Sequence, residues 1–354
     1  MSVDVLLVVP WYGGSHRGWA DGWQAHSRHE ITLVTTPPER WRHHMLAGTA
    51  ELAGMVREQI ATAGRPDVLV VSSLTDVAAL VGLCRHSIGD IAVVAYQHES
   101  QLLHPSHRDN NHALVEIEWR SLAAADRVWF NSEYHLGRYL ATCPHPTRIL
   151  AERSTVLPVG VDLSDIGLWL RPSPRRPGPT RLIFNQRWDA DKRPERVVAA
   201  LANAAAAGAD FEIALAGGQP AHDLRALNRA CERLGSRVIH AGYADRATYL
   251  DLLHNSDAVV GDPAHEFFGV AAVEAMAAGC TPLLPRDLSY PELVGDKSHL
   301  LHESHDLIPR LIDLCSEAVS EPSQDLAELA REVRRFEWAR IAPMYDTALA
   351  ELAR

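Results

Sequence analysis

The sequence has few of the features that stabilise secreted or membrane-embedded proteins. Only five of its 354 residues are cysteine, at positions 84, 143, 231, 280 and 315. This odd, scattered set without CxxC spacing argues against a disulfide framework or a zinc site and indicates a reducing cytoplasm. No apolar run is long enough to span a bilayer, and the N-terminus lacks the basic and apolar regions of a secretory signal. We therefore expect a cytoplasmic protein without a membrane anchor.

The chain also lacks an excess of positive charge, because its net charge is −11. A protein that coats nucleic acid is usually basic, so any contact with RNA must come from a local patch. Arg148, Arg153 and the arginines of RPSPRRP (171–177) are candidates for such a patch, and plain solvation is the alternative. The sequence contains no GxGxxG motif and no metal-ligand spacing among its histidines. We therefore expect no dinucleotide cofactor and no metal.

Short apolar runs alternate with helical segments in two successive series. The first series of runs occupies residues 3–9, 31–36, 67–73, 91–97 and 127–132, and the second occupies 181–187, 211–217, 237–242, 257–263 and 281–285. The runs are nearly continuous in apolar character, as in parallel strands that are buried on both faces. Repeated strand–helix units predict an α/β fold with doubly wound parallel sheets, and the chain is long enough for two such domains.

A segment rich in proline and arginine, RPSPRRPGPT at 171–180, separates the two series. Its composition is typical of a linker. We predict an N-terminal domain over 1–170 and a C-terminal domain over 181–334. Beyond Asp325 the apolar spacing predicts one long terminal helix with a kink at Pro343.

The stretch HEFFGVAAVEA (265–275) places Glu266 and Glu274 eight positions apart, on either side of Phe267, Phe268 and Gly269. Its first half follows a predicted strand, and doubly wound sheets bind ligands at the carboxyl ends of their strands. Gly269 would let the first N–H groups of the next helix approach phosphate oxygens, and Glu274 could accept hydrogen bonds from a ribose diol. With Glu266 on sugar hydroxyls, the arrangement suits a sugar–diphosphate–nucleoside. An ordinary packed helix would need neither Glu266 nor Gly269.

The stretch QRWDADKRPE (186–195) follows the first strand of the second series and precedes a helix that is predicted to open near Pro194. Arg187 and Lys192 would project from the carboxyl end of that strand. Two cations there can neutralise a diphosphate without a metal and stabilise it as a leaving group. The alternative is a solvated basic turn.

Three loops of the first half also follow predicted strands. In PWYGGSH (10–16), Gly13 and Gly14 would let the backbone approach a phosphate or a sugar, although a tight turn explains them equally well. Ser15 is a fair helix N-cap there.

In QHESQLLHP (97–105), His98 and Glu99 lie at a carboxyl edge, which favours a binding role over a structural one. In FNSEYH (130–135), we expect Asn131 or Ser132 to cap the next helix.

Taken together, these stretches resemble a known family. EFFGVAAVEA with RWDADK is similar to the donor site of retaining GT-B glycosyltransferases of the glycosyltransferase family 4-like group, in which two glutamates eight apart flank an FG turn. More narrowly, a set of motifs that runs in order over nearly the whole chain resembles the tRNA-queuosine alpha-mannosyltransferase family: YGGSH (12–16), HESQL (98–102), FNS (130–132), QRWDADK, HEFFGVA and PLLPRDLSYPE (282–292). The chain departs from these patterns at Ser100 and at Val159 in LPVGVD, where asparagine is usual.

The resemblance implies a GT-B fold, with two Rossmann-like doubly wound domains facing a central cleft. The terminal helix, about 335–354, would cross back to the N-terminal domain. It also implies a retaining, metal-independent hexosyltransferase that uses no cofactor. This enzyme would move mannose from GDP-mannose, or a sugar from another nucleotide sugar, to the cyclopentenediol of queuosine in tRNA. The oligomeric state stays open.

The resemblance further implies roles for individual residues. Arg187 and Lys192 would hold the diphosphate, while Glu274 would hold the ribose and Glu266 the mannose hydroxyls. The implied donor-binding set is Gly13, Gly14, Arg187, Lys192, Glu266, Phe267, Phe268, Gly269, Val270 and Glu274. The catalytic set is His98, Arg187, Lys192 and Glu266, with His98 near the transferred sugar. The acceptor set is Ser15, His16, Glu99, Gln101 and Asn131.

Three alternatives remain at the level of sequence. The acceptor could be a small molecule or a lipid carrier, which the acidic total slightly favours. The chain could be a non-catalytic sugar-nucleotide-binding module, although intact Glu266, Glu274, Arg187 and Lys192 count against this. It could also be a sugar-nucleotide epimerase on the same architecture. We find no carboxylate pair that demands double displacement, so the transfer that we expect is front-face, with the departing diphosphate accepting the acceptor's proton.

Overall fold

The computed structural model describes residues 2–104, 112–167, 178–218, 224–303, 305–316 and 323–352. The chain divides into two compact units. Unit 1 comprises Met1–Asp162 and Phe336–Arg354, and unit 2 comprises Leu163–Arg335. Most of the predicted linker, 171–177, lies outside the described residues, and its last residue, Thr180, already belongs to a strand.

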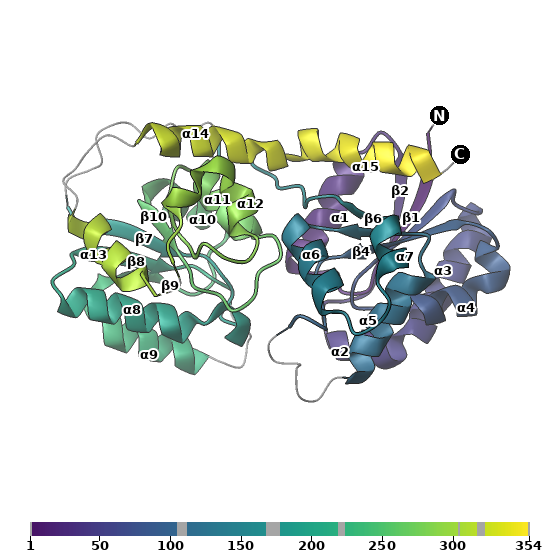
Figure 1. The fold of residues 1–354 in the computed structure, drawn as a ribbon, viewed down its shortest axis with the longest axis horizontal. Helices are drawn as coiled ribbons and strands as arrows, with labels where there is room; N and C mark the ends of the chain where they lie inside the picture. The colour runs from purple at the N-terminus through teal and green to yellow at the C-terminus, as the bar shows by residue number, and fades with distance from the viewer. Residues whose placement is uncertain are drawn as a thin grey trace. The chain divides into compact units, whose positions relative to one another are not determined.

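Unit 1 is built on a six-stranded parallel sheet in the order β2-β1-β3-β4-β5-β6 (Figure 1). Its strands are β1 Asp4–Val9, β2 Glu30–Thr35, β3 Val68–Ser72, β4 Ala92–Gln97, β5 Arg127–Phe130 and β6 Ser154–Val156. The first five confirm the strands predicted from apolar runs. Every residue of β3 is buried, as expected for a parallel strand that is covered on both faces. The edge strand β6 was not predicted, because three residues of mixed polarity give no pattern.

Helices cover both faces of this sheet. They are α1 Gly14–His26, α2 Trp41–His43, α3 Thr49–Ala63, α4 Val77–Ile88, α5 His112–Ala124, α6 Glu133–Thr142, α7 Arg148–Arg153 and α15 Trp338–Leu352, with a π-helical turn at His44–Gly48. α3 and α5 both pack beside α4, and α1 packs against α15. Leu6 and Val8 of β1 belong to the core under α3 and α4, so the alternating Leu7 faces the other layer.

Unit 2 has a five-stranded parallel sheet in the order β11-β10-β7-β8-β9. Its strands are β7 Thr180–Phe184, β8 Phe211–Leu215, β9 Val238–Ala241, β10 Ala258–Val260 and β11 Thr281–Leu283. The chain leaves β7 toward β8 on one side and leaves β10 toward β11 on the other, although β7 and β10 are neighbours. This reversal of strand order is the place where open α/β sheets bind ligands. The loops that carry QRWDADK and HEFFG both begin there.

The helices of unit 2 are α8 Pro194–Ala206, α9 Leu224–Leu234, α10 Arg246–Asn255, α11 Val270–Ala277, α12 Tyr290–Val294, α13 Leu307–Ser316 and α14 Gln324–Glu332. Single 3-10 turns occupy Ala190–Lys192, Gly235–Arg237, Gly295–Leu300 and Val333–Phe336. α8 packs against α9 and α13, whereas α11 packs against α14. α8 opens at Pro194, as predicted. No helix in the described part of either unit is long and apolar enough to cross a membrane.

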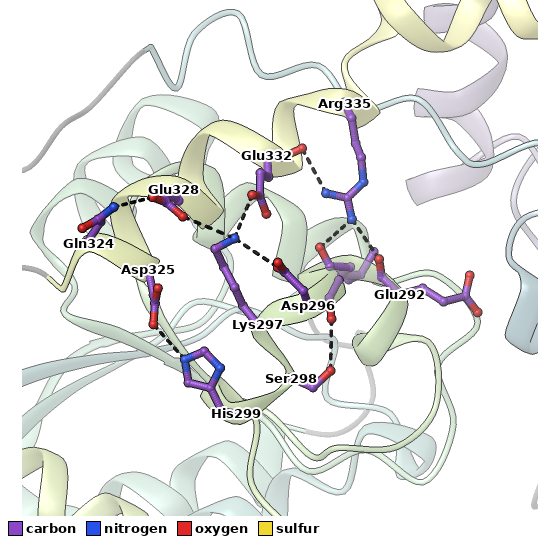
Figure 2. A network of polar contacts seen from close by, with 12 residues as sticks. Glu292, Asp296, Lys297, Ser298, His299, Gln324, Asp325, Glu328, Glu332 and Arg335 are labelled. Carbon is purple, nitrogen blue, oxygen red and sulfur yellow. Dashed lines mark hydrogen bonds and ion pairs between the residues drawn. The ribbon is translucent and has the colours of Figure 1, made fainter.

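A polar network fixes α14 on unit 2 (Figure 2). The ammonium of buried Lys297 lies 2.7 Å from Glu332, 3.2 Å from Asp296 and 3.6 Å from Glu328. Its hydrogen bond with Glu332 contributes most to a raised pKa of Lys297. Arg335 donates to the carbonyl oxygens at the end of α12. Lys297 thus joins α14 to the 3-10 turn that contains it, and Arg335 joins the segment after α14 to α12.

The C-terminal segment forms two helices, so the prediction of one helix with a kink at Pro343 is wrong. α14 ends at Glu332, and Pro343 lies inside α15. Between them lies the 3-10 turn Val333–Phe336, and the carbonyl of its last residue, Phe336, accepts from the N–H of Val161 at 2.8 Å. A tertiary hydrogen bond, which the local sequence does not reveal, therefore lies where the two helices are separated.

Two glycines accommodate the first residue of α15. A Cβ on Gly22 of α1 would lie 2.0 Å from Nε1 of Trp338, and a Cβ on Gly160 would lie 2.2 Å from its Cδ2. Trp338 is therefore packed against bare backbone on two sides. Gly18, one turn earlier in α1, has nothing within 4 Å of such a Cβ.

We predict opposite effects for alanine at these two positions of α1. Gly22→Ala should lower the free energy of unfolding by about 1–3 kcal/mol, because the methyl group overlaps Trp338. Gly18→Ala should raise it by about 0.5–1 kcal/mol, because alanine favours a helix interior. Urea denaturation checks both, and equal effects of the two changes would contradict the packing described.

Candidate functional site

Two loops at the carboxyl edge of the unit 2 sheet are tied to each other. The N–H of Ala264, after β10, donates to the carbonyl of Asp191, after β7, at 2.7 Å. The ammonium of Lys192 donates to the carbonyl of His265 at 2.9 Å and to Oε2 of Glu266 at 3.0 Å. The structure thus brings together two residues that the sequence assigned separately to the site.

The surroundings of Lys192 keep it charged. Its side chain is buried, and Nζ also lies 3.3 Å from Oδ2 of Asp191. Burial works against the charged form, whereas the carboxylates of Glu266 and Asp191 favour it, and the net effect is a raised pKa of Lys192. A cation that two carboxylates hold at this edge is present at neutral pH for any anionic ligand.

Arg187 lies on the same loop in a more open environment. Its side chain is 54% exposed, and Nη1 lies 3.0 Å from Oδ2 of Asp189. This loop passes close to the loop that follows β8, since a Cβ on Gly217 would lie only 1.7 Å from the carbonyl oxygen of Gln186. Backbone packing thus fixes the base of the loop and leaves the guanidinium at the surface.

The FG turn requires its glycine. Gly269 has φ 98° and is the N-cap of α11. A Cβ there would lie 3.3 Å from both Tyr290 and Leu293. The first N–H groups of a helix have no intrahelical acceptor and form its positive end, so they can bind an anion. Phe267 and Phe268 are buried, so only their backbone is placed to contribute.

Glu274, in the middle of α11, is held by two donors. Its carboxylate lies 2.7 Å from Nη1 of Arg246 and accepts from the hydroxyl of Tyr249 at 2.9 Å. Burial raises the pKa of Glu274, against the effect of Arg246. Asn185, directly after β7, donates to Tyr249 and to the carbonyl of Ala271. Sequence reasoning missed Asn185, Arg246 and Tyr249, although Asn185 and Arg246 each lie close behind the carboxyl end of a strand.

A second polar cluster lies at the carboxyl edge of the unit 1 sheet. The imidazole of His98, after β4, lies 4.2 Å from that of His16 in α1, measured between ring centroids. Nε2 of His98 and Nδ1 of His16 have no hydrogen-bond partner among the described residues. Burial, with a smaller effect of His16, lowers the pKa of His98 well below its usual value. His98 is therefore a neutral imidazole.

Two aromatic rings pack against the imidazole of His98. Trp19 and Tyr96 each lie 4.6 Å from it between ring centroids. The indole N–H of Trp19 donates to the hydroxyl of Tyr345 at 3.0 Å, and that hydroxyl donates to Tyr96 at 2.9 Å. Since Tyr345 belongs to α15, this helix helps to position the imidazole of His98.

Asn131 fixes this cluster from inside. Its Nδ2 donates to the carbonyl of His98 at 3.0 Å, and its Oδ1 lies 2.8 Å from Nδ1 of His135. Ser132 accepts from the N–H of His135, which confirms it as the cap of α6. Asn131 is therefore a buried positioning residue, and its predicted acceptor contact stays a prediction. His135 was missed, although it lies one turn after Asn131.

The loop after β1 has structural reasons for its glycines. A Cβ on Gly13 would lie 2.5 Å from Cβ of Pro38, and Gly14 has φ 51°. The N-cap of α1 is Gly13, so the prediction of Ser15 as the cap is wrong. Ser15 is exposed in the first turn, where Gly14 already starts the helix. The donor contacts of Gly13 and Gly14 and the acceptor contact of Ser15 stay predictions.

A buried carboxylate organises the HESQL loop. Glu118 of α5 accepts from the N–H groups of Gln101 and Leu102 at 3.1 and 3.0 Å and from the hydroxyl of Ser100 at 3.2 Å. Burial nevertheless raises the pKa of Glu118 to about 7. The hydroxyl of Ser100 therefore stabilises the loop itself, and Gln101 is buried beside it. Glu99 stays partly exposed, 3.9 Å from His16. No local pattern in the sequence pointed to Glu118.

Comparisons with known proteins agree with this architecture. An Anabaena HepE structure in complex with UDP and glucose matches with a TM-score of 0.70 at 17% identity, covering 98% of this chain and 100% of that one. Sucrose-phosphate synthase from Thermosynechococcus elongatus matches with a TM-score of 0.71 at 17% identity, covering 99% of both chains. Residues 4–161 match the family model of the tRNA-queuosine alpha-mannosyltransferase N-terminal domain, and residues 167–333 match that of glycosyl transferases group 1. The chain belongs to the GT-B glycosyltransferases. The predicted fold class is confirmed.

Two curated relatives of this glycosyltransferase are themselves mannosyltransferases. A tRNA-queuosine alpha-mannosyltransferase from Drosophila melanogaster is 27% identical over 334 residues, which are 88% of this chain and 86% of the relative. A GDP-mannose-dependent alpha-(1-6)-phosphatidylinositol dimannoside mannosyltransferase from Mycobacterium tuberculosis is 28% identical over 221 residues, 58% of this chain and 54% of the relative.

The titration of Glu118 gives a prediction about pH. Its pKa is raised from 4.5 to about 7 in the folded protein, so the unfolded chain loses this proton at lower pH. The stability of the glycosyltransferase should therefore fall by about 3 kcal/mol between pH 4.5 and 7, relative to a Glu118→Gln variant in which the group does not titrate. Urea denaturation of both proteins at pH 5 and pH 8 measures this. A difference between them that does not change with pH would refute the buried, protonatable carboxyl.

Proposed function

We propose that this glycosyltransferase moves mannose from GDP-mannose to the cyclopentenediol of queuosine in tRNA, with retention of configuration and without a metal ion. The observation that carries the proposal is the ion pair of Lys192 and Glu266, beside the N-terminus of α11, in a chain whose N-terminal half matches the queuosine family model. The activity of the Drosophila relative supports the acceptor, and both curated relatives support mannose.

In this proposal the diphosphate of the donor binds at the start of α11. Arg187, Lys192 and the backbone N–H groups of Gly269 and Val270 supply the positive field. Lys192 is buried, so its charge acts in surroundings of low dielectric constant, where it stabilises a departing diphosphate more strongly than in water. Glu266, next to Lys192, accepts hydrogen bonds from mannose hydroxyls.

The ribose binds at Glu274. Arg246 and Tyr249 fix its carboxylate in one orientation, and each carboxylate oxygen can accept a further hydrogen bond. A ribose diol supplies two donors for those positions. The contacts within the protein thus prepare Glu274 for the ribose instead of competing with it.

Transfer proceeds on one face of the sugar. The bond between the anomeric carbon and the diphosphate oxygen breaks, and an acceptor hydroxyl bonds to the same face of that carbon. The hydroxyl proton passes to the departing diphosphate oxygen, so no side chain has to accept it. Burial lowers the pKa of His98, so in this proposal His98 hydrogen-bonds a hydroxyl and does not serve as a general acid.

The acceptor assignment is tested with tRNA that carries queuosine. The protein is incubated with GDP-mannose and this tRNA, and nucleoside mass spectrometry follows the queuosine mass. We expect the gain of one hexose. No gain, with GDP-mannose binding intact, would overturn the tRNA acceptor and leave a small-molecule or lipid acceptor.

We predict that Lys192→Met and Glu266→Gln each lower kcat/KM for transfer by at least about 100-fold, because each removes a group that contacts the donor at the reacting centre. Arg181→Met and Glu212→Gln are matched controls. Their ion pair of 3.5 Å joins β7 and β8 on the same sheet but near its amino edge. Both controls should keep near-normal activity. Normal turnover by either donor-site variant would refute the assignment.

A further inference from the structure

The segment that follows β2 is basic and aromatic within an acidic chain. Residues 40–50, RWRHHMLAGTA, contain two arginines, two histidines and a tryptophan but no acidic residue, although the whole chain has a net charge of −11. We call residues 40–46 the RWRHHML segment. It comprises α2 and the first residues of the π-helical turn.

Both arginines of this segment are exposed. Among the residues that the structure describes, Arg40 and Arg42 form no ion pair with a carboxylate, and both side chains are exposed. Arg148, which the sequence suggested as part of a basic patch, lies 3.0 Å from Glu152 instead. Arg153 donates to the carbonyl of Ala125. Of the two arginines of that patch that the structure describes, Arg148 is thus paired with a carboxylate, unlike Arg40 and Arg42.

Trp41 gives the segment a fixed aromatic surface. The guanidinium of Arg42 lies over its ring, 5.2 Å from the centroid. The indole is half-buried and packs against a small core that contains Met45 and Leu74. A cation stacked on an anchored ring is a surface on which nucleic-acid bases stack, while the neighbouring arginine contacts phosphates.

The RWRHHML segment lies on the same edge of the sheet as the imidazole cluster. It follows the carboxyl end of β2, and His98 follows the carboxyl end of β4 in the same parallel sheet. Trp11 packs on the same small core as Trp41, and its ring lies 5.3 Å from that of His16. Continuous packing thus connects the segment to the predicted acceptor residues.

We propose that the RWRHHML segment is the surface of this enzyme that binds the phosphate backbone and an unpaired base of its RNA acceptor. The inference rests on the proposed function in taking RNA as the acceptor. The positive charge of the segment suits RNA and an anionic membrane alike, and RNA is favoured because Leu46 is the one large apolar side chain of the segment that is exposed. Membrane-surface helices need a continuous apolar face.

The test measures tRNA binding by fluorescence anisotropy without any sugar donor. The double variant Arg40→Ala/Arg42→Ala should bind roughly tenfold more weakly at moderate salt. Its slope of log affinity against log salt should be shallower by about 1–2, since each arginine that contacts a phosphate contributes about one counterion. The matched control is Arg85→Ala/Arg127→Ala, at the end of α4 and the start of β5, hence at the amino edge of the same sheet. It should bind like the wild type.

Each other outcome decides against the proposal. It is overturned if wild-type protein does not bind tRNA, if the Arg40/Arg42 variant binds normally, or if the control weakens binding equally. Vesicles containing phosphatidylglycerol form a second arm, and loss of vesicle binding with unchanged tRNA binding would assign the segment to a membrane. Binding through this segment without hexose transfer to the tRNA would refute the proposed function and leave the surface intact.

Discussion

The ion pair between Lys192 and Glu266 is the interaction on which the candidate site of unit 2 depends. It joins the loops that follow two neighbouring strands, at the point where the strand order reverses. Removal of one partner from a buried pair typically costs about 3–5 kcal/mol, because the other charge is left uncompensated. Such a pair is a poor choice for stability alone, since apolar residues of similar volume often do as well. Its presence here is explained if both groups serve a charged, hydroxyl-rich ligand.

The same principle appears at other polar groups of both units, where contacts within the protein orient the groups before any ligand binds. Arg246 and Tyr249 orient Glu274, and Asn131 holds the backbone of His98. Glu118 accepts hydrogen bonds from two N–H groups of the HESQL loop. Preorganised polar groups lower the cost of orienting a substrate, and their own hydrogen bonds explain why they can stay buried.

The fold could be predicted from the sequence because parallel strands that are buried on both faces consist of continuous apolar runs, such as that of β3. It also located Glu266, Gly269 and Lys192 at strand ends. It could not show the pairing of Lys192 with Glu266, 74 positions apart, or the support of His98 by Tyr345 from α15. Local patterns carry no information on such contacts. The errors at Pro343 and Ser15 have the same origin, since a bond from Val161 and the packing of Gly13 lie at those helix ends.

A crystal structure of the protein with bound GDP-mannose tests the central claim most directly. The account predicts diphosphate oxygens within hydrogen-bond distance of the Lys192 ammonium at the start of α11, mannose hydroxyls on Glu266 and ribose hydroxyls on Glu274. A nucleotide sugar bound elsewhere, with the Lys192–Glu266 pair unchanged and out of contact with it, would contradict the account.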